Sequence, residues 1–324
     1  MKKPSALFAL RRHSPLERRL IGGLGGLEVS LVGLGCNAFG RRIGEAETHA
    51  VLDAAIDAGI DFLDTAETYG DGQSEAFMGT GLKGKRNRVL IASKFGFAKS
   101  HVAGKPPGSA ENIRAALEES LKKLQTDRID LYQLHRPDAA TPVAETMGAL
   151  EDLVAEGKIR FYGCSFYTGA QIREAASEAK RASLKGFVTA QNAWNVLLRD
   201  IETDLVPACE SEGITILPYY PVAKGLLTGK YRRGNAAPSG SRLANEPDLA
   251  DADFDVLEQL ETYAKDHGHD LLTLAMSWLA AQPVTASIIA GASKQEQTGA
   301  NVSAAGWKMT PSNLAEIDAI VSKE

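Results

Sequence analysis

Residues 129–165 read IDLYQLHRPDAATPVAETMGALEDLVAEGKIRFYGCS, and this stretch decides the fold. Apolar residues run through Ile129–Leu134 and again through Lys158–Tyr162, while Pro142–Glu156 between them has the length and mixed composition of a helix. A strand, a helix and a second strand in this order make a βαβ unit with parallel strands. His135 directly follows the first strand, where a parallel sheet commonly carries functional side chains.

The same alternation of apolar strand and helix continues in both directions along the chain. Eight apolar segments are predicted as strands: Leu31–Leu34, Ile60–Leu63, Val89–Ala92, Ile129–Leu134, Lys158–Tyr162, Phe187–Ala190, Ile214–Pro218 and Ala286–Ile289. The predicted helices are Glu45–Ala58, Ser74–Leu82, Ser109–Leu124, Pro142–Glu156, Thr168–Arg181, Ile201–Glu212, Asp253–Lys265, Leu271–Ala281, Lys294–Ala304 and Pro311–Val321. Continuous apolar strands are typical of a parallel sheet buried on both faces. We therefore predict an α/β protein with the (β/α)8 TIM-barrel fold.

The ends of the chain add a tail and a hairpin to this barrel. Arg19–Gly23 and Leu27–Ser30 flank a glycine-rich turn, which predicts a short amino-terminal β-hairpin. Residues 1–17 are interpreted as a loose tail, and residues 18–324 as a single domain, because no linker divides them. The segment 223–251 is rich in Gly, Pro, Asn and Ser, and a loop of this length is usually functional.

Composition excludes several classes of partner. The 324 residues contain 36 Lys and Arg against 41 Asp and Glu, a net charge of −5, which argues against a nucleic-acid-binding protein. No run of about 18 apolar residues is present, so no membrane-spanning helix is expected. The three cysteines are scattered, which predicts neither disulfides nor a metal site and favours a cytoplasmic location. No pattern in the sequence indicates an oligomeric state.

Four polar residues follow neighbouring strands: Asp64, Tyr69, Lys94 and His135. Because the carboxyl ends of the strands form the active site of such a barrel, we expect these side chains to meet. An ammonium group stabilises a nearby phenolate, so Lys94 is expected to lower the pKa of Tyr69 from about 10. With Asp64 fixing Lys94 and a neutral His135 orienting a carbonyl oxygen, Tyr69 would act as a general acid toward that oxygen.

These residues lie in motifs that resemble those of the aldo-keto reductases. Residues 64–70, DTAETYG, match the family's D-T-A-x-x-Y-G, Lys94 matches its strand-end lysine, and residues 131–135, LYQLH, match its strand-end histidine motif. The resemblance extends from about Leu20 to Asn301. It implies reversible NADP(H)-dependent reduction of aldehydes or ketones to alcohols, in which hydride leaves the nicotinamide and Tyr69 donates the proton. It implies no catalytic metal.

The resemblance also assigns a cofactor site. Ser165 and Gln191 would bind the nicotinamide carboxamide, and Tyr219 would stack on the ring. The remaining implied contacts are Gly225, Leu226, Gly229 and Lys230 at the pyrophosphate, and Gly291, Ser293, Lys294, Gln297 and Asn301 at the adenosine end. Lys294 is placed to meet a 2′-phosphate at the start of a helix, so NADP is favoured over NAD.

Four positions depart from the family's pattern: Phe166, Trp194, Gln297 and Tyr220, of which Trp194 replaces a common Tyr and Tyr220 a Ser near the pyrophosphate. Phe166 stands where many relatives carry an Asn that holds the carboxamide, which leaves Ser165 and Gln191 for that contact. Gln297 replaces an Arg that some relatives use against the 2′-phosphate. Trp194 and Val196, with Phe97, predict an apolar or aromatic substrate pocket.

Two other functions remain open from the residues alone. Some proteins of the family sense nicotinamide cofactors as regulatory subunits of potassium channels and turn over slowly, so the chain could be a binding protein of this kind. The second alternative is a barrel hydrolase or lyase that uses Asp64 and His135 without nicotinamide.

Overall fold

The computed structural model describes residues 16–23, 25–97, 101–244 and 249–322. Eight parallel strands form its centre: β3 Val32–Gly35, β4 Phe62–Asp64, β5 Leu90–Phe95, β6 Ile129–Leu134, β7 Ile159–Ser165, β8 Thr189–Gln191, β9 Thr215–Ile216 and β10 Ile288–Gly291. They pair in the order β10-β3-β4-β5-β6-β7-β8-β9. Parallel bridges from Ile216 to Thr285 and from Tyr219 to Ile289 join the two ends of this sheet. The predicted (β/α)8 barrel is therefore confirmed.

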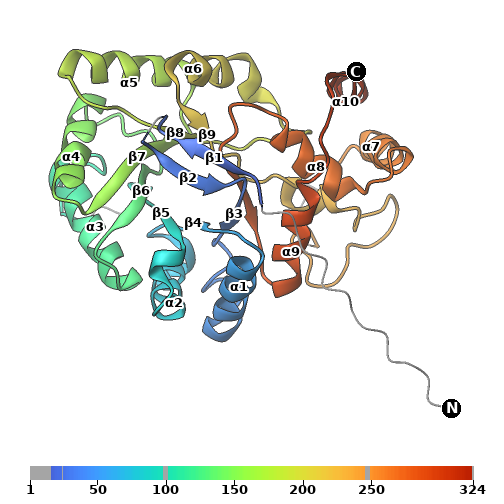
Figure 1. Cartoon of the computed structure of the whole chain (residues 1–324), viewed down its shortest axis with the longest axis horizontal. Helices are drawn as coiled ribbons and strands as arrows, with labels where there is room; N and C mark the ends of the chain where they lie inside the picture. The colour runs from blue at the N-terminus through green and yellow to red at the C-terminus, as the bar shows by residue number, and fades with distance from the viewer. Residues whose placement is uncertain (1–15, 24, 98–100, 245–248, 323–324) are drawn as a thin grey trace.

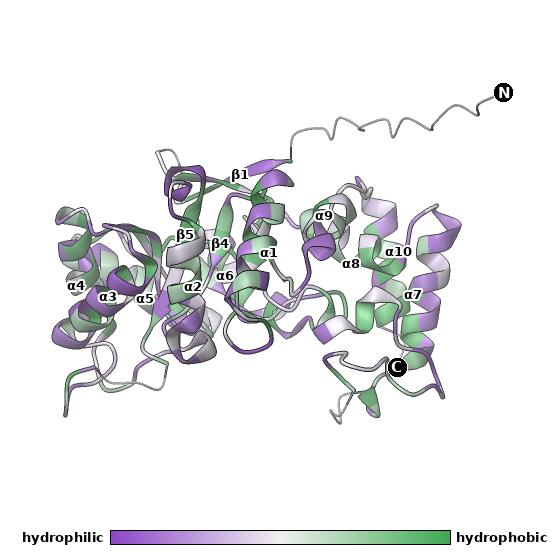
Figure 2. Cartoon of the chain, turned by 90° about the horizontal axis from the view of Figure 1, so that it is seen from below, coloured by the Kyte–Doolittle hydropathy of each residue, from purple (hydrophilic) through white to green (hydrophobic). Residues whose placement is uncertain are grey.

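Helices surround the strands, as Figure 1 shows. They are α1 Glu45–Asp57, α2 Gln73–Gly81, α3 Ala110–Leu124, α4 Val143–Ala155, α5 Gly169–Ala182, α6 Leu205–Glu212, α7 Phe254–Asp266, α8 Leu271–Ala280, α9 Gln295–Ala304 and α10 Pro311–Val321. Short 3-10 turns are η1 Tyr69–Gly72, η2 Arg86–Arg88, η3 Asp200–Thr203 and η4 Ala223–Thr228. Along α3 and α7, Figure 2 shows both hydrophilic and hydrophobic residues, as expected of helices with one face on a core. None of the helices in the described ranges is long and apolar enough to cross a bilayer.

Several boundaries differ from the prediction. The predicted helix Ile201–Glu212 is wrong in its first turn, because η3 precedes α6 there. Pro207 has no backbone N–H and therefore lies in the first turn of α6, where such a group would have no helical partner. The strands β5 and β7 continue past their predicted ends to Phe95 and Ser165. Backbone pairing with neighbouring strands, such as Lys94 with Gln133, holds polar positions in the sheet.

The amino-terminal hairpin closes one end of the barrel. Its strands are β1 Arg18–Ile21 and β2 Leu27–Ser30, paired antiparallel. Apolar side chains of the hairpin (Ile21, Leu27 and Val29) form one buried cluster with Phe62 and other residues from inside the barrel. Figure 1 shows the hairpin lying across the strands. This end is sealed by apolar packing, so the other end remains for a site.

The predicted tail falls mostly outside the described residues, because residues 1–15 are not among them. Its last two positions touch the domain. Leu16 packs against the core, and the backbone oxygen of Glu17 accepts a hydrogen bond of 2.8 Å from the N–H of Leu31. The division of the chain into a tail and one domain stays a prediction.

Candidate active site

The carboxyl ends of the strands open into a cavity of about 940 Å³. Its wall includes Asp64, Tyr69 and His135, and Lys94 lies directly behind them, bonded to the first two. The predicted group of four is therefore brought together by tertiary structure.

Lys94 is the centre of the group. Its side chain is fully buried, at 0% exposure. Its Nζ donates to Asp64 Oδ2 at 2.7 Å, to the backbone oxygen of Thr65 at 2.8 Å and to Tyr69 Oη at 3.2 Å. An ammonium group has three N–H donors, so all three have acceptors. Burial pulls the pKa of Lys94 down, but the charge of Asp64 and the phenol of Tyr69 raise it further, and the group stays cationic.

Asp64 is held from both sides. One carboxylate oxygen accepts from Lys94, and the other accepts from Gln191 Nε2 at 2.9 Å. Only 2% of Asp64 is exposed. A buried carboxylate is tolerated when a counter-charge and hydrogen bonds satisfy it, as they do here. Asp64 thereby fixes the position of the ammonium group against Tyr69.

The pKa of Tyr69 differs from the sequence prediction. Burial raises this pKa above its usual value, and the lowering effect of Lys94 is smaller than the effect of burial. The expectation of a lowered pKa is therefore wrong, because desolvation of a phenolate outweighs one cation that is itself paired with Asp64. The phenol stays protonated around neutral pH and keeps its proton for donation.

His135 is neutral. Burial, followed by the charges of Lys94 and Arg136, lowers the pKa of its imidazole from 6.5 to about 3. Its ring lies edge-on to that of Tyr69, with centroids 6.0 Å apart and an interplanar angle of 80°. The atom Nδ1 is buried and has no hydrogen-bond partner among the described residues. A neutral imidazole beside a protonated phenol can hold a carbonyl oxygen by hydrogen bonding.

Three residues with predicted nicotinamide contacts lie along the same end of the barrel. Ser165 pairs with Gln191 across β7 and β8, and Ser165 Oγ donates to the Gln191 backbone oxygen at 2.7 Å. Tyr219 lines the cavity beside them. Phe166 occupies the left-handed region with φ of 60°, a conformation that Asn adopts far more readily than Phe. The backbone here has a conformation suited to Asn, while the side chain carries no amide.

The four predicted pyrophosphate contacts separate into two pairs. Gly225 and Lys230 line the cavity. Leu226 and Gly229 are not part of its described wall: Leu226 packs against the hydrophobic core, and Gly229 ends η4 with φ of 71°. Gly225 has φ of 108°, which a residue with a Cβ rarely adopts, so the turn needs glycine there.

All five predicted adenosine-end residues line the cavity: Gly291, Ser293, Lys294, Gln297 and Asn301. At the start of α9, Gln297 Oε1 accepts from the backbone N–H of Ser293 at 2.7 Å and of Lys294 at 3.1 Å. An anion at this helix start must displace the Gln297 amide or bind through side chains alone.

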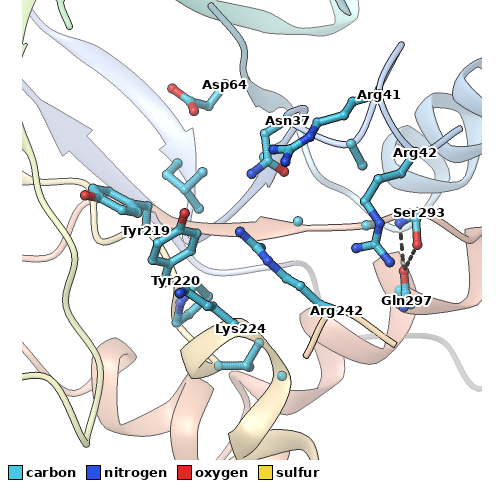
Figure 3. Close-up of a pocket in the computed structure, with 18 of the residues that line it drawn as sticks. Asn37, Arg41, Arg42, Asp64, Tyr219, Tyr220, Lys224, Arg242, Ser293 and Gln297 are labelled. Carbon is cyan, nitrogen blue, oxygen red and sulfur yellow. Dashed lines mark hydrogen bonds between the residues drawn. The ribbon is translucent and has the colours of Figure 1, made fainter. Parts of the chain in front are cut away.

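The sequence analysis missed a group of cations at this end. Arg41 and Arg42 follow β3, and Arg242 comes from the long loop after η4. In Figure 3 the three guanidinium groups point into the cavity, with Arg42 drawn next to Ser293 and Gln297. Arg242 also stacks on Tyr220, with its Cζ 4.8 Å from the ring centroid. The pair Arg41-Arg42, in the loop between β3 and α1, was the available signal.

The cavity is strongly cationic. The described residues of its wall include seven Lys or Arg and one carboxylate, although the whole chain has a net charge of −5. The cations are Arg41, Arg42, Arg136, Lys224, Lys230, Arg242 and Lys294. Such a field favours a polyanionic ligand such as a dinucleotide phosphate.

Two predicted substrate contacts are wrong. Trp194 and Val196 are buried in the core and are not part of the described cavity wall, whereas Phe97 is. Trp194 packs edge-on against Trp278, and its Nε1 donates to Glu202. Trp194 and Val196 are apolar because they pack in the core, and not because they line a substrate pocket.

The described residues contain no group of three or more His, Cys, Asp or Glu able to hold a metal ion. The closely spaced His267 and His269 both stack on Trp307 instead.

A family model described as the Aldo/keto reductase family matches residues 31–322. The chain is 34% identical to a probable aldo-keto reductase of Glycine max, covering 91% of this chain and 86% of that protein. It is 33% identical to a probable voltage-gated potassium channel subunit beta of Oryza sativa subsp. japonica, covering 93% and 96% respectively.

Solved structures agree with these sequence matches. An aldo-keto reductase from Bacillus halodurans in its holo form is 31% identical, with a TM-score of 0.77 over 94% of this chain and 96% of that one. A glycerol dehydrogenase from Gluconobacter oxydans is 28% identical, with a TM-score of 0.80 over 94% and 95%.

Proposed function

Since the chain belongs to the aldo/keto reductase family, we propose that it reduces aldehydes or ketones to alcohols with NADPH, and catalyses the reverse oxidation. The observation that carries this proposal is the buried Asp64–Lys94–Tyr69 group, with the neutral His135 beside it. The cationic wall of the same cavity favours a dinucleotide ligand, which the alternative of a hydrolase or lyase without nicotinamide does not require.

The residues present fit a nicotinamide dinucleotide. Ser165 and Gln191 offer hydrogen-bonding groups at the strand ends, and the aromatic ring of Tyr219 lies next to them. The cations of the wall extend from there toward α9, where phosphates would be held. A bound nicotinamide cofactor supplies a hydride to the substrate's carbonyl carbon.

The chain's own residues supply the proton that the carbonyl oxygen takes up. Tyr69 Oη donates its proton to the carbonyl oxygen, because the raised pKa keeps the phenol protonated. Lys94, 3.2 Å from Oη, stabilises the negative charge that develops on the phenol oxygen as the proton leaves. His135 orients the carbonyl oxygen without competing as an acid, since its imidazole is neutral. Asp64 and Gln191 keep Lys94 in place.

We propose NADP rather than NAD because of the cations near α9. Arg42 and Lys294 lie on the cavity wall with Ser293 and Gln297, where the 2′-phosphate is expected. Arg42 Nη2 is also 3.5 Å from the backbone oxygen of Gly240, so it joins the loop after β3 to the long loop. These cations offset the missing arginine at position 297.

The test begins with binding. NADPH and NADH are titrated separately while tryptophan fluorescence is followed, and 4-nitrobenzaldehyde is then added while the nicotinamide absorbance is followed. We expect tight NADPH binding and aldehyde-dependent oxidation. Arg42→Met should weaken NADPH binding about tenfold more than NADH binding. Equal weakening of both would argue against a 2′-phosphate contact.

Tyr69→Phe tests the chemical role. This variant should lose carbonyl reduction by about 10²- to 10⁴-fold while binding NADPH as before. Tyr263→Phe is the matched control and should retain activity, because Tyr263 is a half-buried tyrosine outside the described cavity wall, bonded to Asn313. Unchanged turnover in Tyr69→Phe would exclude the phenol as the proton donor.

A second function is favoured by one observation, the 33% identity to a probable potassium channel subunit beta. In that case the chain would bind nicotinamide cofactor as a sensor with little turnover. Tight NADPH binding without oxidation by a range of reactive aldehydes would support it. The cytoplasmic location stays a prediction.

A further inference from the structure

Two aromatic rings hold an arginine at the mouth of the cavity. The Cζ atom of Arg136 lies 4.2 Å from the ring centroid of Phe166 and 4.7 Å from that of Phe97. Stacking on aromatic faces fixes the plane of a guanidinium group and leaves its N–H donors, which lie in that plane, for other partners. Arg136 is exposed and lines the cavity.

The guanidinium group has no acidic partner in the described part of the chain, and no hydrogen bond to it. The nearest acid in sequence, Asp138, is committed elsewhere: it accepts from the N–H of Gly108 at 2.8 Å, from the N–H of Ala140 at 2.9 Å and from Thr141 Oγ1 at 2.7 Å. Arg136 therefore lines the cavity with a charge that no acidic group in the described part of the chain offsets.

The same two rings lie against the catalytic histidine. The centroid of His135 is 4.9 Å from that of Phe97 and 6.4 Å from that of Phe166, and Phe166 is 5.7 Å from Tyr219. A substrate whose carbonyl oxygen meets His135 and Tyr69 would extend past these rings toward Arg136.

The unusual residue Phe166 takes part in this arrangement. It keeps a left-handed backbone conformation, φ 60°, that is unfavourable for a side chain of its size. The contact of its ring with Arg136 is a favourable interaction that opposes that cost. This gives a physical reason for an aromatic residue at a position whose backbone suits Asn.

We propose that Arg136 is a specificity-determining residue that binds a carboxylate, so that the preferred substrates are aldehydes or ketones carrying a carboxylate a short distance from the carbonyl group. Guanidinium and carboxylate groups match in shape and can form two parallel hydrogen bonds. This proposal rests on the proposed carbonyl reduction at the same site.

The experiment compares two substrates that differ only in charge, 4-carboxybenzaldehyde and methyl 4-formylbenzoate. The wild-type protein should show a higher kcat/KM for the acid than for the ester. Arg136→Met, which keeps most of the apolar stem, should lower this acid-to-ester ratio by about 10- to 100-fold. Arg136→Lys should lower it less, because charge remains but the paired geometry is lost. Arg88→Met, at an exposed position on η2, makes the same charge change outside the cavity wall and should leave the ratio unchanged.

The outcomes separate the two proposals. An unchanged ratio in Arg136→Met, or equal use of acid and ester by the wild-type protein, would overturn the carboxylate site while carbonyl reduction stands. If neither compound is turned over, binding of benzoate and benzamide to the protein with NADP⁺ is measured by calorimetry. Tighter binding of benzoate that Arg136→Met abolishes would support the site even then; equal affinities would refute it.

Discussion

Two buried aspartates, Asp64 on β4 and Asp130 on β6, have different roles although only β5 separates their strands. Asp130 is the second residue of β6, near the sealed end, and Asp64 ends β4 at the open end. Asp130 accepts from Arg86 at 2.8 Å, from Arg160 at 3.0 Å and from the backbone N–H of Ile91 at 3.0 Å. Asp64 accepts from Lys94 and Gln191.

The two sites differ in the other hydrogen bonds that Arg86 and Lys94 donate. Arg86 also donates to the backbone oxygens of Val89 and Arg128 and to Thr126, so its contacts all serve packing. Lys94 instead gives one donor to Tyr69, a side chain that lines the cavity. An ion pair whose cation donates only to groups away from the cavity stabilises the structure. An ion pair whose cation also donates to a side chain of the cavity wall can support chemistry.

The strongest test of this comparison is Lys94→Met. The substitution removes the cation beside Tyr69 and leaves Asp64 buried without its counter-charge, so we expect carbonyl reduction to fall about 10³-fold. Steady-state rates with NADPH and 4-nitrobenzaldehyde measure the effect. A rate and a pH profile like those of the wild-type protein would show that Lys94 only supports the fold.

Asp130→Asn is the counterpart at the other end. It removes the acidic partner that the part-buried Arg86 has among the described residues, so we expect the free energy of unfolding to fall by about 3 kcal/mol. The kcat of the folded variant should match the wild type, because Asp130 is bonded only to groups away from the cavity. Urea unfolding and steady-state kinetics on one preparation give both numbers. A large loss of kcat would erase the distinction between the two aspartates.

The open end also carries a histidine that resists protonation. The folded-state pKa of His135 is about 3, below its unfolded value of 6.5, so the unfolded chain binds the proton first as the pH falls. Stability is therefore lost on going below pH 6.5, by about 2 kcal/mol between pH 7 and pH 5 from this group. His135→Asn should lack that loss, and the difference between the two pH dependences in urea unfolding isolates it. Parallel pH dependences would mean that His135 takes up its proton at the same pH in the folded and unfolded states.

The smallest effect is expected at Phe166, next to the same histidine. Phe166→Asn relieves the left-handed strain but loses the ring's packing on Arg136, so the free energy of unfolding should change by less than about 1 kcal/mol. Phe166→Ala loses the packing and keeps the strain, and should be the less stable of the two. Thermal unfolding of both variants would show this order; the reverse order would mean that backbone strain is absent at this position.

Sequence reasoning predicted the barrel because apolar periodicity reports burial, and β6 and α10 match their predicted bounds. It missed how far β5 and β7 extend, since Lys94 and Ser165 are polar and only pairing with the adjacent strand shows that they belong to the sheet. The four catalytic candidates could be predicted because each lies at or after the carboxyl end of a strand, and parallel strands bring these ends to one edge.

Quantities that depend on three-dimensional surroundings were not available from the residues alone. Proximity to Lys94 predicted a lowered pKa for Tyr69, but the depth of burial decides the direction, and burial is a property of the packed barrel. The sequence predicted Trp194 as a substrate contact, but in the structure its side chain is buried in the core, where it packs against Trp278 of α8.

The sequence by itself determined the alternation of strands and helices and the chemical types at the strand ends, because both are local patterns along one chain. Only the tertiary structure decided which cations share a cavity. Arg42, Arg242 and Lys294 are far apart in sequence and meet because the loop after β3, the long loop and α9 converge over one end of the barrel. Arg136 and the two rings that it contacts, Phe97 and Phe166, likewise come from three places in the sequence, after β6, β5 and β7. These contacts between residues far apart in sequence follow from closure of the barrel, which no local sequence pattern encodes.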